Sequence, residues 1–215
     1  MINLLKFQFR NLLKNKMFYI FLCLTMLENF VRLRAFEGKI GLADFVAINI
    51  FEIIILCIFA TFDSDNCTIK NIIAKGYDKV RLLFSKYIVA IFILIVFVLL
   101  KVLMYFMFAK HTSGVWTNLG QNIICLIPEV IFYVTLSIII GKLKISLSTC
   151  VLVQIFIPSL LIFIDKLDKL NVKLLNYWLG CLYSLDNVSK IIVSLIYTAL
   201  FVAIGIFAVR RKEIK

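Results

Sequence analysis

The chain lacks the short motifs that identify many enzymes. Its 215 residues contain no Gly-x4-Gly-Lys-Ser/Thr phosphate loop, no His-Glu-x-x-His pattern and no Gly-x-Ser-x-Gly pattern. We therefore expect neither the usual ATP site nor an intramembrane hydrolase. The single histidine, His111, cannot form a multi-histidine metal site or a relay between histidines. The sequence predicts no catalytic, cofactor-binding or metal-binding residue in this chain.

Acidic residues are also scarce. Twelve Asp and Glu face 24 Lys and Arg, so that the formal net charge is +12, while 63% of the chain is hydrophobic. The mean hydropathy of +1.03 is too high for a soluble domain, in which the apolar share is nearer half. We predict an integral membrane protein whose excess positive charge contacts anionic headgroups. Nucleic-acid binding is disfavoured because no polar domain is present to carry it.

Six apolar stretches are predicted to cross the membrane in a single all-α domain, residues 1–215. About twenty helical residues are needed to cross about 30 Å of hydrocarbon. With both termini in the cytoplasm, 15 Lys and Arg lie inside and eight outside, leaving out Lys101, as the positive-inside rule favours. The predicted spans are residues 17–30 with a short extension, 42–62, 87–109, 122–140, 145–164 and 191–209.

Three connecting segments have predicted roles of their own. Residues 1–16 place Leu5, Phe9, Leu12 and Leu13 opposite Lys6, Arg10 and Lys14, which predicts an amphipathic helix in the cytoplasmic headgroup layer. An ordinary basic flank of the first span is the alternative. Residues 141–144 are expected to form a tight cytoplasmic turn. Residues 165–190 are too apolar for a free loop and are expected to re-enter the outer leaflet.

The segment from Asp63 to Lys86 is polar and mostly basic, between two apolar runs. Its five basic residues against three acids place it in the cytoplasm. The pattern up to Gly76 predicts a short amphipathic helix that ends at that glycine. Asp78 is then the expected N-cap of a helix that continues into the third span. A short interfacial helix joined to a spanning helix can transmit force from a cytoplasmic partner.

The same segment resembles the type-2 ABC transporter permease family, whose motif is matched by Asp63, Cys67-Thr68, Lys70, Ile72-Ile73, Gly76, Asp78-Lys79 and Ser85-Lys86. Three positions depart from the family pattern: Asp63 replaces Glu, Cys67 replaces Gly, and Asp78-Lys79 replaces Ser/Thr-Arg. The resemblance extends over nearly the whole chain, because the amphipathic start, the six predicted spans and the apolar outside segment before the last span also fit.

The resemblance implies the permease subunit of a bacterial exporter in the cytoplasmic membrane. Two copies, or this chain with a related permease, would form the pore, and separate ATPase subunits would hold ATP and Mg beneath a coupling helix. The exporter would move antimicrobial or amphipathic peptides, or would protect the producing cell against them. Drugs and lipid-linked molecules are alternative cargoes. The implied coupling residues are Asp63, Thr68, Lys70, Gly76, Asp78, Lys79 and Lys86.

Another class of function also fits. A non-transporting immunity or sensor protein would bind a peptide or partner through its outside segment and would need no ATPase. A basic loop after the second span occurs in other six-span proteins too.

Three ionisable residues lie within predicted spans: Glu52, Lys101 and Glu129. Each costs about 2.5 to 3.5 kcal/mol at the bilayer centre on insertion scales, so each is expected to face protein or water and to be paired. They either line a substrate path or act as buried polar partners between helices.

Overall fold

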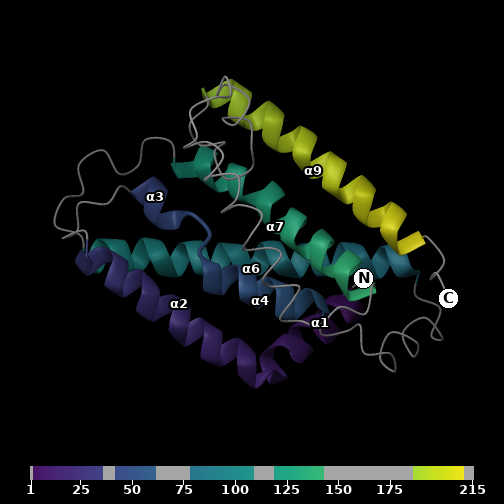
Figure 1. Ribbon diagram of the computed structural model, residues 1–215, viewed down its shortest axis with the longest axis horizontal. Helices are drawn as coiled ribbons and strands as arrows, with labels where there is room; N and C mark the ends of the chain where they lie inside the picture. The colour runs from purple at the N-terminus through teal and green to yellow at the C-terminus, as the bar shows by residue number, and fades with distance from the viewer. Residues whose placement is uncertain (1, 36–41, 62–77, 109–118, 143–185, 211–215) are drawn as a thin grey trace, which may run out of the picture.

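The computed structural model describes residues 2–35, 42–61, 78–108, 119–142 and 186–210. Every element within these ranges is an α-helix (Figure 1). The all-α fold is therefore confirmed for this part of the chain. The helices are α1 (Ile2–Lys14), α2 (Lys16–Ala35), α3 (Leu42–Val46), α4 (Ile50–Thr61), α6 (Lys79–Phe108), α7 (Leu119–Lys142) and α9 (Asn187–Arg210).

Among the described residues, three helices are long and apolar enough to cross a membrane: α6, the Ile123–Ile140 part of α7, and the Val188–Arg210 part of α9. They coincide with the predicted third, fourth and sixth spans. Helix α2 has 20 residues, but its outer half carries Glu28, Arg32 and Arg34. The predicted fifth span, 145–164, lies outside the described residues, so the count of six spans stays a prediction.

The helices run through the bundle in alternating directions. In Figure 1, α2 runs one way, α3 and α4 return, α6 runs the first way again and α7 returns. Helix α9 runs in the same direction as α7. The start of α1 and the end of α9 consequently lie toward the same end of the bundle, as expected if both termini face one side of a membrane.

Helix α6 is the centre of the packing. It contacts α1, α2, α3, α4, α7 and α9, and its inward side chains include Val89, Ala90 and Ile93, all at most 4% exposed. Glycine permits the close approach of α9 to α6, because a Cβ at Gly205 of α9 would overlap the Tyr87 hydroxyl of α6. That hydroxyl lies 2.7 Å from the Thr135 hydroxyl of α7. Three helices therefore meet at one hydrogen-bonded junction.

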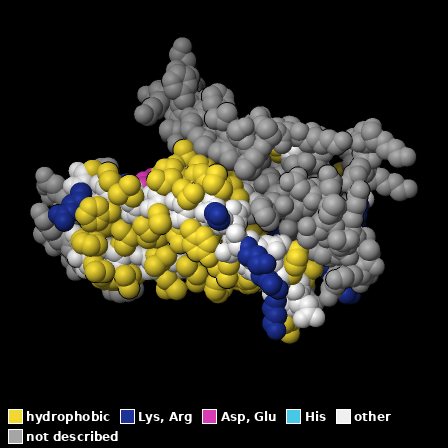
Figure 2. All heavy atoms as spheres, turned by 90° about the horizontal axis from the view of Figure 1, so that it is seen from below, with side chains coloured by type: hydrophobic (Ala, Val, Ile, Leu, Met, Phe, Trp, Pro, Cys, Tyr) yellow, Lys and Arg dark blue, Asp and Glu magenta, His cyan; other side chains and the backbone are white. Residues whose placement is uncertain are grey.

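The outward faces are apolar. Large hydrophobic side chains are exposed on α2, α6 and α9, among them Leu99 at 63%, Leu195 at 62% and Phe207 at 65%. Figure 2 shows a broad hydrophobic surface on one face, with Lys and Arg at only a few points. A contiguous apolar surface of this kind is unfavourable in water, and hydrocarbon chains of a bilayer suit it. The Phe-rich third span follows this division, since Phe92 faces outward and Phe97 is buried.

Helix α1 forms as predicted and packs against α6. Leu12 is buried and Leu5 and Phe9 are partly buried, with the Phe9 and Phe92 rings in edge contact at 5.0 Å between centroids. Leu13, predicted on the same side, is instead 55% exposed. The position of α1 in a headgroup layer stays a prediction.

Residues 42–61 of the predicted second span do not form one uninterrupted helix. The chain leaves the helix after Val46 and resumes at Ile50, so α3 and α4 are separate. The physical reason is local capping of the second piece, described below.

Two boundaries also differ from the prediction. Gly141 and Lys142 continue α7 and do not open a tight turn, and α9 begins four residues before the predicted sixth span. Asp186 explains this second start, because its Oδ2 accepts a hydrogen bond of 3.1 Å from the Ser189 N–H, as an N-cap does. Hydrogen bonding with the Ser189 side chain, and after it with the Ser189 N–H, lowers the pKa of the Asp186 carboxyl. The rest of the predicted re-entrant segment, 165–185, lies outside the described residues.

Candidate functional site: a buried charge centre at a helix break

The break between α3 and α4 is stabilised by a capping box. The Glu52 N–H donates to Asn49 Oδ1 at 3.0 Å, and the Asn49 N–H donates to Glu52 Oε2 at 3.1 Å. The reciprocal bonds satisfy two backbone donors that the start of α4 would otherwise leave without acceptors. Asn49 is thus the N-cap of α4, and Glu52 is fixed in its first turn.

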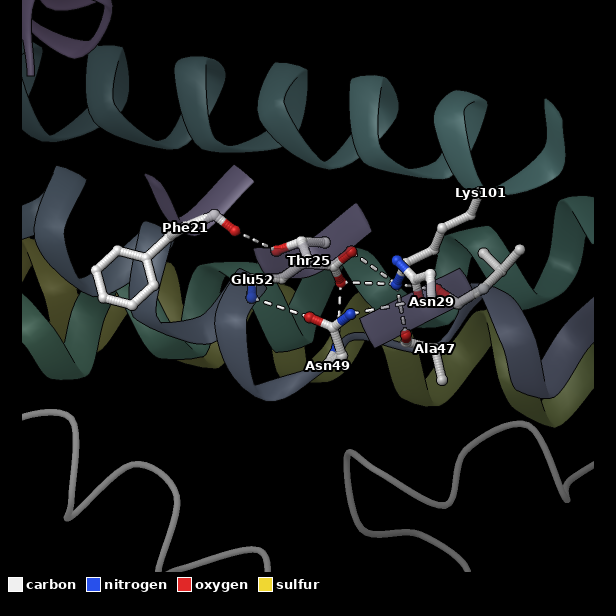
Figure 3. Close-up of polar contacts among 8 residues, drawn as sticks. Phe21, Thr25, Asn29, Ala47, Asn49, Glu52 and Lys101 are labelled. Atoms are coloured by element: carbon white, nitrogen blue, oxygen red, sulfur yellow. Dashed lines mark hydrogen bonds and ion pairs between the residues drawn. The ribbon is translucent and has the colours of Figure 1, made fainter. Parts of the chain in front are cut away.

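Lys101 of α6 reaches into this break (Figure 3). Its Nζ lies 2.7 Å from Glu52 Oε1 and 2.8 Å from Glu52 Oε2. The same nitrogen donates to the Ala47 carbonyl at 2.8 Å and approaches the Val46 carbonyl at 3.5 Å. Carbonyls at a helix end lack intrahelical partners and carry the negative end of the helix dipole. The ammonium is therefore surrounded by oxygen atoms of one short chain segment.

Both charged partners are removed from solvent: Lys101 is 1% exposed and Glu52 is 2% exposed. Charges buried this deeply are tolerated only when they are paired and hydrogen-bonded. The expected pairing is confirmed for Glu52 and Lys101. We call Glu52, Lys101, Asn49 and the carbonyls of residues 46 and 47 the charge centre.

Helix α2 closes the charge centre from the other side. Asn29 is fully buried, and its Oδ1 accepts a hydrogen bond of 3.4 Å from Asn49 Nδ2. One turn earlier, the buried Thr25 hydroxyl donates to the Phe21 carbonyl at 2.9 Å. Asn29 Nδ2 and Glu28 Oε2 are buried atoms with no hydrogen-bond partner among the described residues. Polar atoms thus gather where α2, the break and α6 meet (Figure 3).

Glu129 lies on α7 and is half-buried. The Tyr133 hydroxyl lies 3.5 Å from its Oε1, at the outer limit for a hydrogen bond. Glu129 is near enough to Glu52 and Lys101 to interact electrostatically without belonging to their ion pair. The structure therefore brings the three ionisable residues into one region and pairs two of them.

The implied coupling residues are only partly described. Asp63, Thr68, Lys70 and Gly76 lie outside the described residues. Asp78 takes the predicted place directly before α6, where its carbonyl accepts the Leu82 N–H at 3.2 Å. Asp78 and Lys79 are exposed, as is Arg81.

Lys86 differs from them, because it is only 4% exposed. Its Nζ donates to the Ala60 carbonyl at 2.6 Å, in the last turn of α4. This position favours a cation, because the negative end of a helix dipole lies there.

Two lysines of α6 consequently contact the two ends of α4. Lys101 contacts its first turn through Glu52, and Lys86 contacts its last turn. The lysines are fifteen positions apart on one uninterrupted helix, which corresponds to about 22 Å. Helices α4 and α6 are therefore fixed in register at two separated points.

Sequence reasoning found Glu52 and Lys101 but missed Asn29 and Asn49. The available signal was Asn-x-x-Glu over residues 49–52, a pattern typical of helix N-termini. Within the described residues no group of three or more His, Cys, Asp or Glu could hold a metal ion. Comparisons of the chain with protein-family models, with curated proteins and with solved structures find no match.

Proposed function

We propose that this chain is the permease subunit of an ATP-driven exporter in the bacterial cytoplasmic membrane. Separate ATPase subunits with bound ATP and Mg would supply the work, and a second identical or related permease would complete the pore. The observation that carries the proposal is the continuity of α6. It runs without a break from exposed Lys79 and Arg81 to Lys101 in the charge centre.

This continuity gives a route for force. A helix of 30 residues is about 45 Å long, so a displacement at its cytoplasmic end moves the far end as well. Lys86 and Lys101 attach it to α4 at two points. The break at residues 47–49 is where the neighbouring segment can bend, because hinges are typically a few residues at the ends of elements.

The direction of the helices supports the six-span topology. Helices α7 and α9 run in the same direction, which is the arrangement that one further crossing between them would produce. The proposed cargo is an antimicrobial or amphipathic peptide, as the resemblance to peptide-exporting permeases implies. Export and self-protection are both covered by this proposal.

The test is isolation of the tagged chain from its native cells in mild detergent. We expect a partner that carries a phosphate loop and hydrolyses ATP in the complex. The double variant Lys79→Glu, Arg81→Glu should lose this partner or its transport-coupled ATPase activity, since it reverses two exposed charges within the predicted coupling segment, residues 63–86. The matched control is Lys6→Glu, Arg10→Glu on the exposed side of α1, which should retain the partner.

Absence of any ATP-hydrolysing partner from the wild-type preparation would overturn the proposal. The chain would then be better explained as a non-transporting immunity or sensor protein. Equal loss of the partner in both double variants would show that net charge alone holds the complex.

A further inference from the structure

The oxygen atoms around Lys101 Nζ come from one short segment, whereas the ammonium comes from another helix. Glu52 supplies two oxygens at 2.7 and 2.8 Å and Ala47 supplies a carbonyl at 2.8 Å, with the Val46 carbonyl at 3.5 Å. We call these four oxygens of residues 46–52 the cradle. It has the composition of a binding site for a group that carries several N–H donors and a positive charge.

We propose that the cradle is a binding site for a primary ammonium group, and that Lys101 is its intramolecular occupant. In this arrangement Lys101 keeps the site filled until a competing ammonium displaces it. The proposal concerns the residues at the break alone and does not require the chain to be a permease.

The first argument is that the cradle is held in shape without Lys101. Asn49 fixes the Glu52 carboxylate through the Asn49 N–H at 3.1 Å and fixes the Glu52 backbone through its own side-chain oxygen at 3.0 Å. The carbonyls of residues 46 and 47 are directed by the end of α3, which packs against α6 and α7. A site that is organised before its ligand arrives loses less free energy on binding.

The second argument is the surplus of negative charge. Glu28 is close enough to interact electrostatically with both Lys101 and Glu52, and its buried Oε2 has no hydrogen-bond partner among the described residues. Arg32 interacts electrostatically with Glu28 and Lys101. When Lys101 is removed, Glu52 and Glu28 are left with one nearby base, Arg32, so an occupant that replaces Lys101 must also be cationic.

The third argument concerns which cation fits. A primary ammonium has three donors on one small head, which matches a carboxylate and a carbonyl that converge on one nitrogen. A quaternary ammonium carries the same charge but has no N–H to donate. Guanidinium presents its donors in a planar fork, which suits a single bidentate carboxylate better than this set.

In a permease the natural competitor would be an ammonium group of the cargo, such as a lysine side chain or the N-terminus of a peptide. This extension rests on the proposed function. Arrival of the cargo would release Lys101 from the cradle and free one of the two attachments between α4 and α6.

The experiment is chemical rescue of Lys101→Ala in detergent. This substitution removes a propylammonium fragment, so n-propylammonium is the matched probe. We expect it to raise the unfolding midpoint in a saturable manner by at least about 2 °C. Tetramethylammonium, which lacks donors, and n-propanol, which lacks charge, should not do so. The double variant Lys101→Ala, Glu52→Gln should not respond either, because the carboxylate is gone.

If Lys101→Ala does not accumulate in membranes, its accumulation in cells grown with and without n-propylammonium becomes the readout, and the same controls apply. No rescue in either assay, or equal rescue by tetramethylammonium or in the double variant, overturns the binding site. The cargo extension has its own test in the wild-type complex. A lysine-containing peptide should stimulate ATP hydrolysis more than its Nε-acetylated form, and equal stimulation overturns the extension while the rescue result stands.

Discussion

Removal of one partner of the buried ion pair should be the most damaging single change at the charge centre. Lys101→Met keeps a long side chain of similar volume but removes the ammonium. It leaves the Glu52 carboxylate, 2% exposed, and the Ala47 carbonyl without their donor. Breaking a buried pair in this way typically costs about 3 to 5 kcal/mol of unfolding free energy.

The magnitude depends on how much of the cost comes from the uncompensated carboxylate. Glu52→Gln added to Lys101→Met removes that charge, while the amide oxygen can still accept the Asn49 N–H that Oε2 accepts at 3.1 Å. We therefore expect the double variant to be more stable than Lys101→Met alone. A coupling free energy of about 1 to 3 kcal/mol between the two positions is expected for partners in direct contact.

The assay is reversible unfolding of purified protein in mixed micelles with rising denaturing detergent, followed by far-ultraviolet circular dichroism. The four proteins of the cycle are measured in one buffer. Thr25→Val at a neighbouring buried site is a suitable control, because among the described residues the Thr25 hydroxyl donates to the Phe21 carbonyl of its own helix. If the double variant is as unstable as Lys101→Met, the carboxylate is not the source of the loss and the reasoning is refuted.

Three further predictions concern the caps and the close contact. Asn49→Ala should lower the unfolding free energy by about 1 kcal/mol because α4 loses its N-cap, and Asn49→Ser, which keeps an acceptor, should lose less in the same assay. Gly205→Ala should cost about 1 to 3 kcal/mol because the added Cβ overlaps the Tyr87 hydroxyl. Tyr87→Phe should relieve part of that cost, and a full loss in the double variant would exclude this contact as the cause. Hydrogen bonding with Ser189 lowers the pKa of the Asp186 carboxyl. The ionised carboxyl should therefore stabilise the start of α9 fully at pH values above the ordinary pKa of Asp. This stabilisation should disappear as pH falls through the lowered pKa. The measurement is protection of the Ser189 amide against hydrogen exchange as a function of pH. The control is Asp186→Ala, in which this protection should not depend on pH in the same range.

Apolar run length and charge distribution were sufficient to predict the long helices. The third span was predicted as residues 87–109 with a helical extension back to Lys79, and α6 covers Lys79–Phe108. This succeeded because uninterrupted apolar residues and an N-cap at Asp78 act locally. The pairing of Glu52 with Lys101 was expected on energetic grounds alone, since a buried charge without a partner is too costly.

The break at residues 47–49 was not predicted, because hydropathy is insensitive to it. Residues on both sides of the break are apolar, so the run over 42–62 looks continuous. Its cause is a competition between helix continuation and the capping box of Asn49 with Glu52, and the carbonyls released by the break are satisfied by Lys101, 54 residues away from Ala47. The capping box is a local signal that a hydropathy profile does not register, whereas the contribution of Lys101 from a distant helix cannot be read from the sequence around the break.

The placement of the two buried lysines indicates more than stabilisation. Apolar side chains of similar volume are often as stabilising as a buried ion pair, so packing alone does not explain both Lys86 and Lys101. Each contacts a different end of α4, and the observed register of α6 against that helix brings each ammonium to an oxygen acceptor there. A slide of one helical turn, about 5.4 Å, would remove the acceptors from both ammonium groups at once. The pair therefore stabilises the register between α4 and α6 that the structure shows and opposes a slide of one helix along the other.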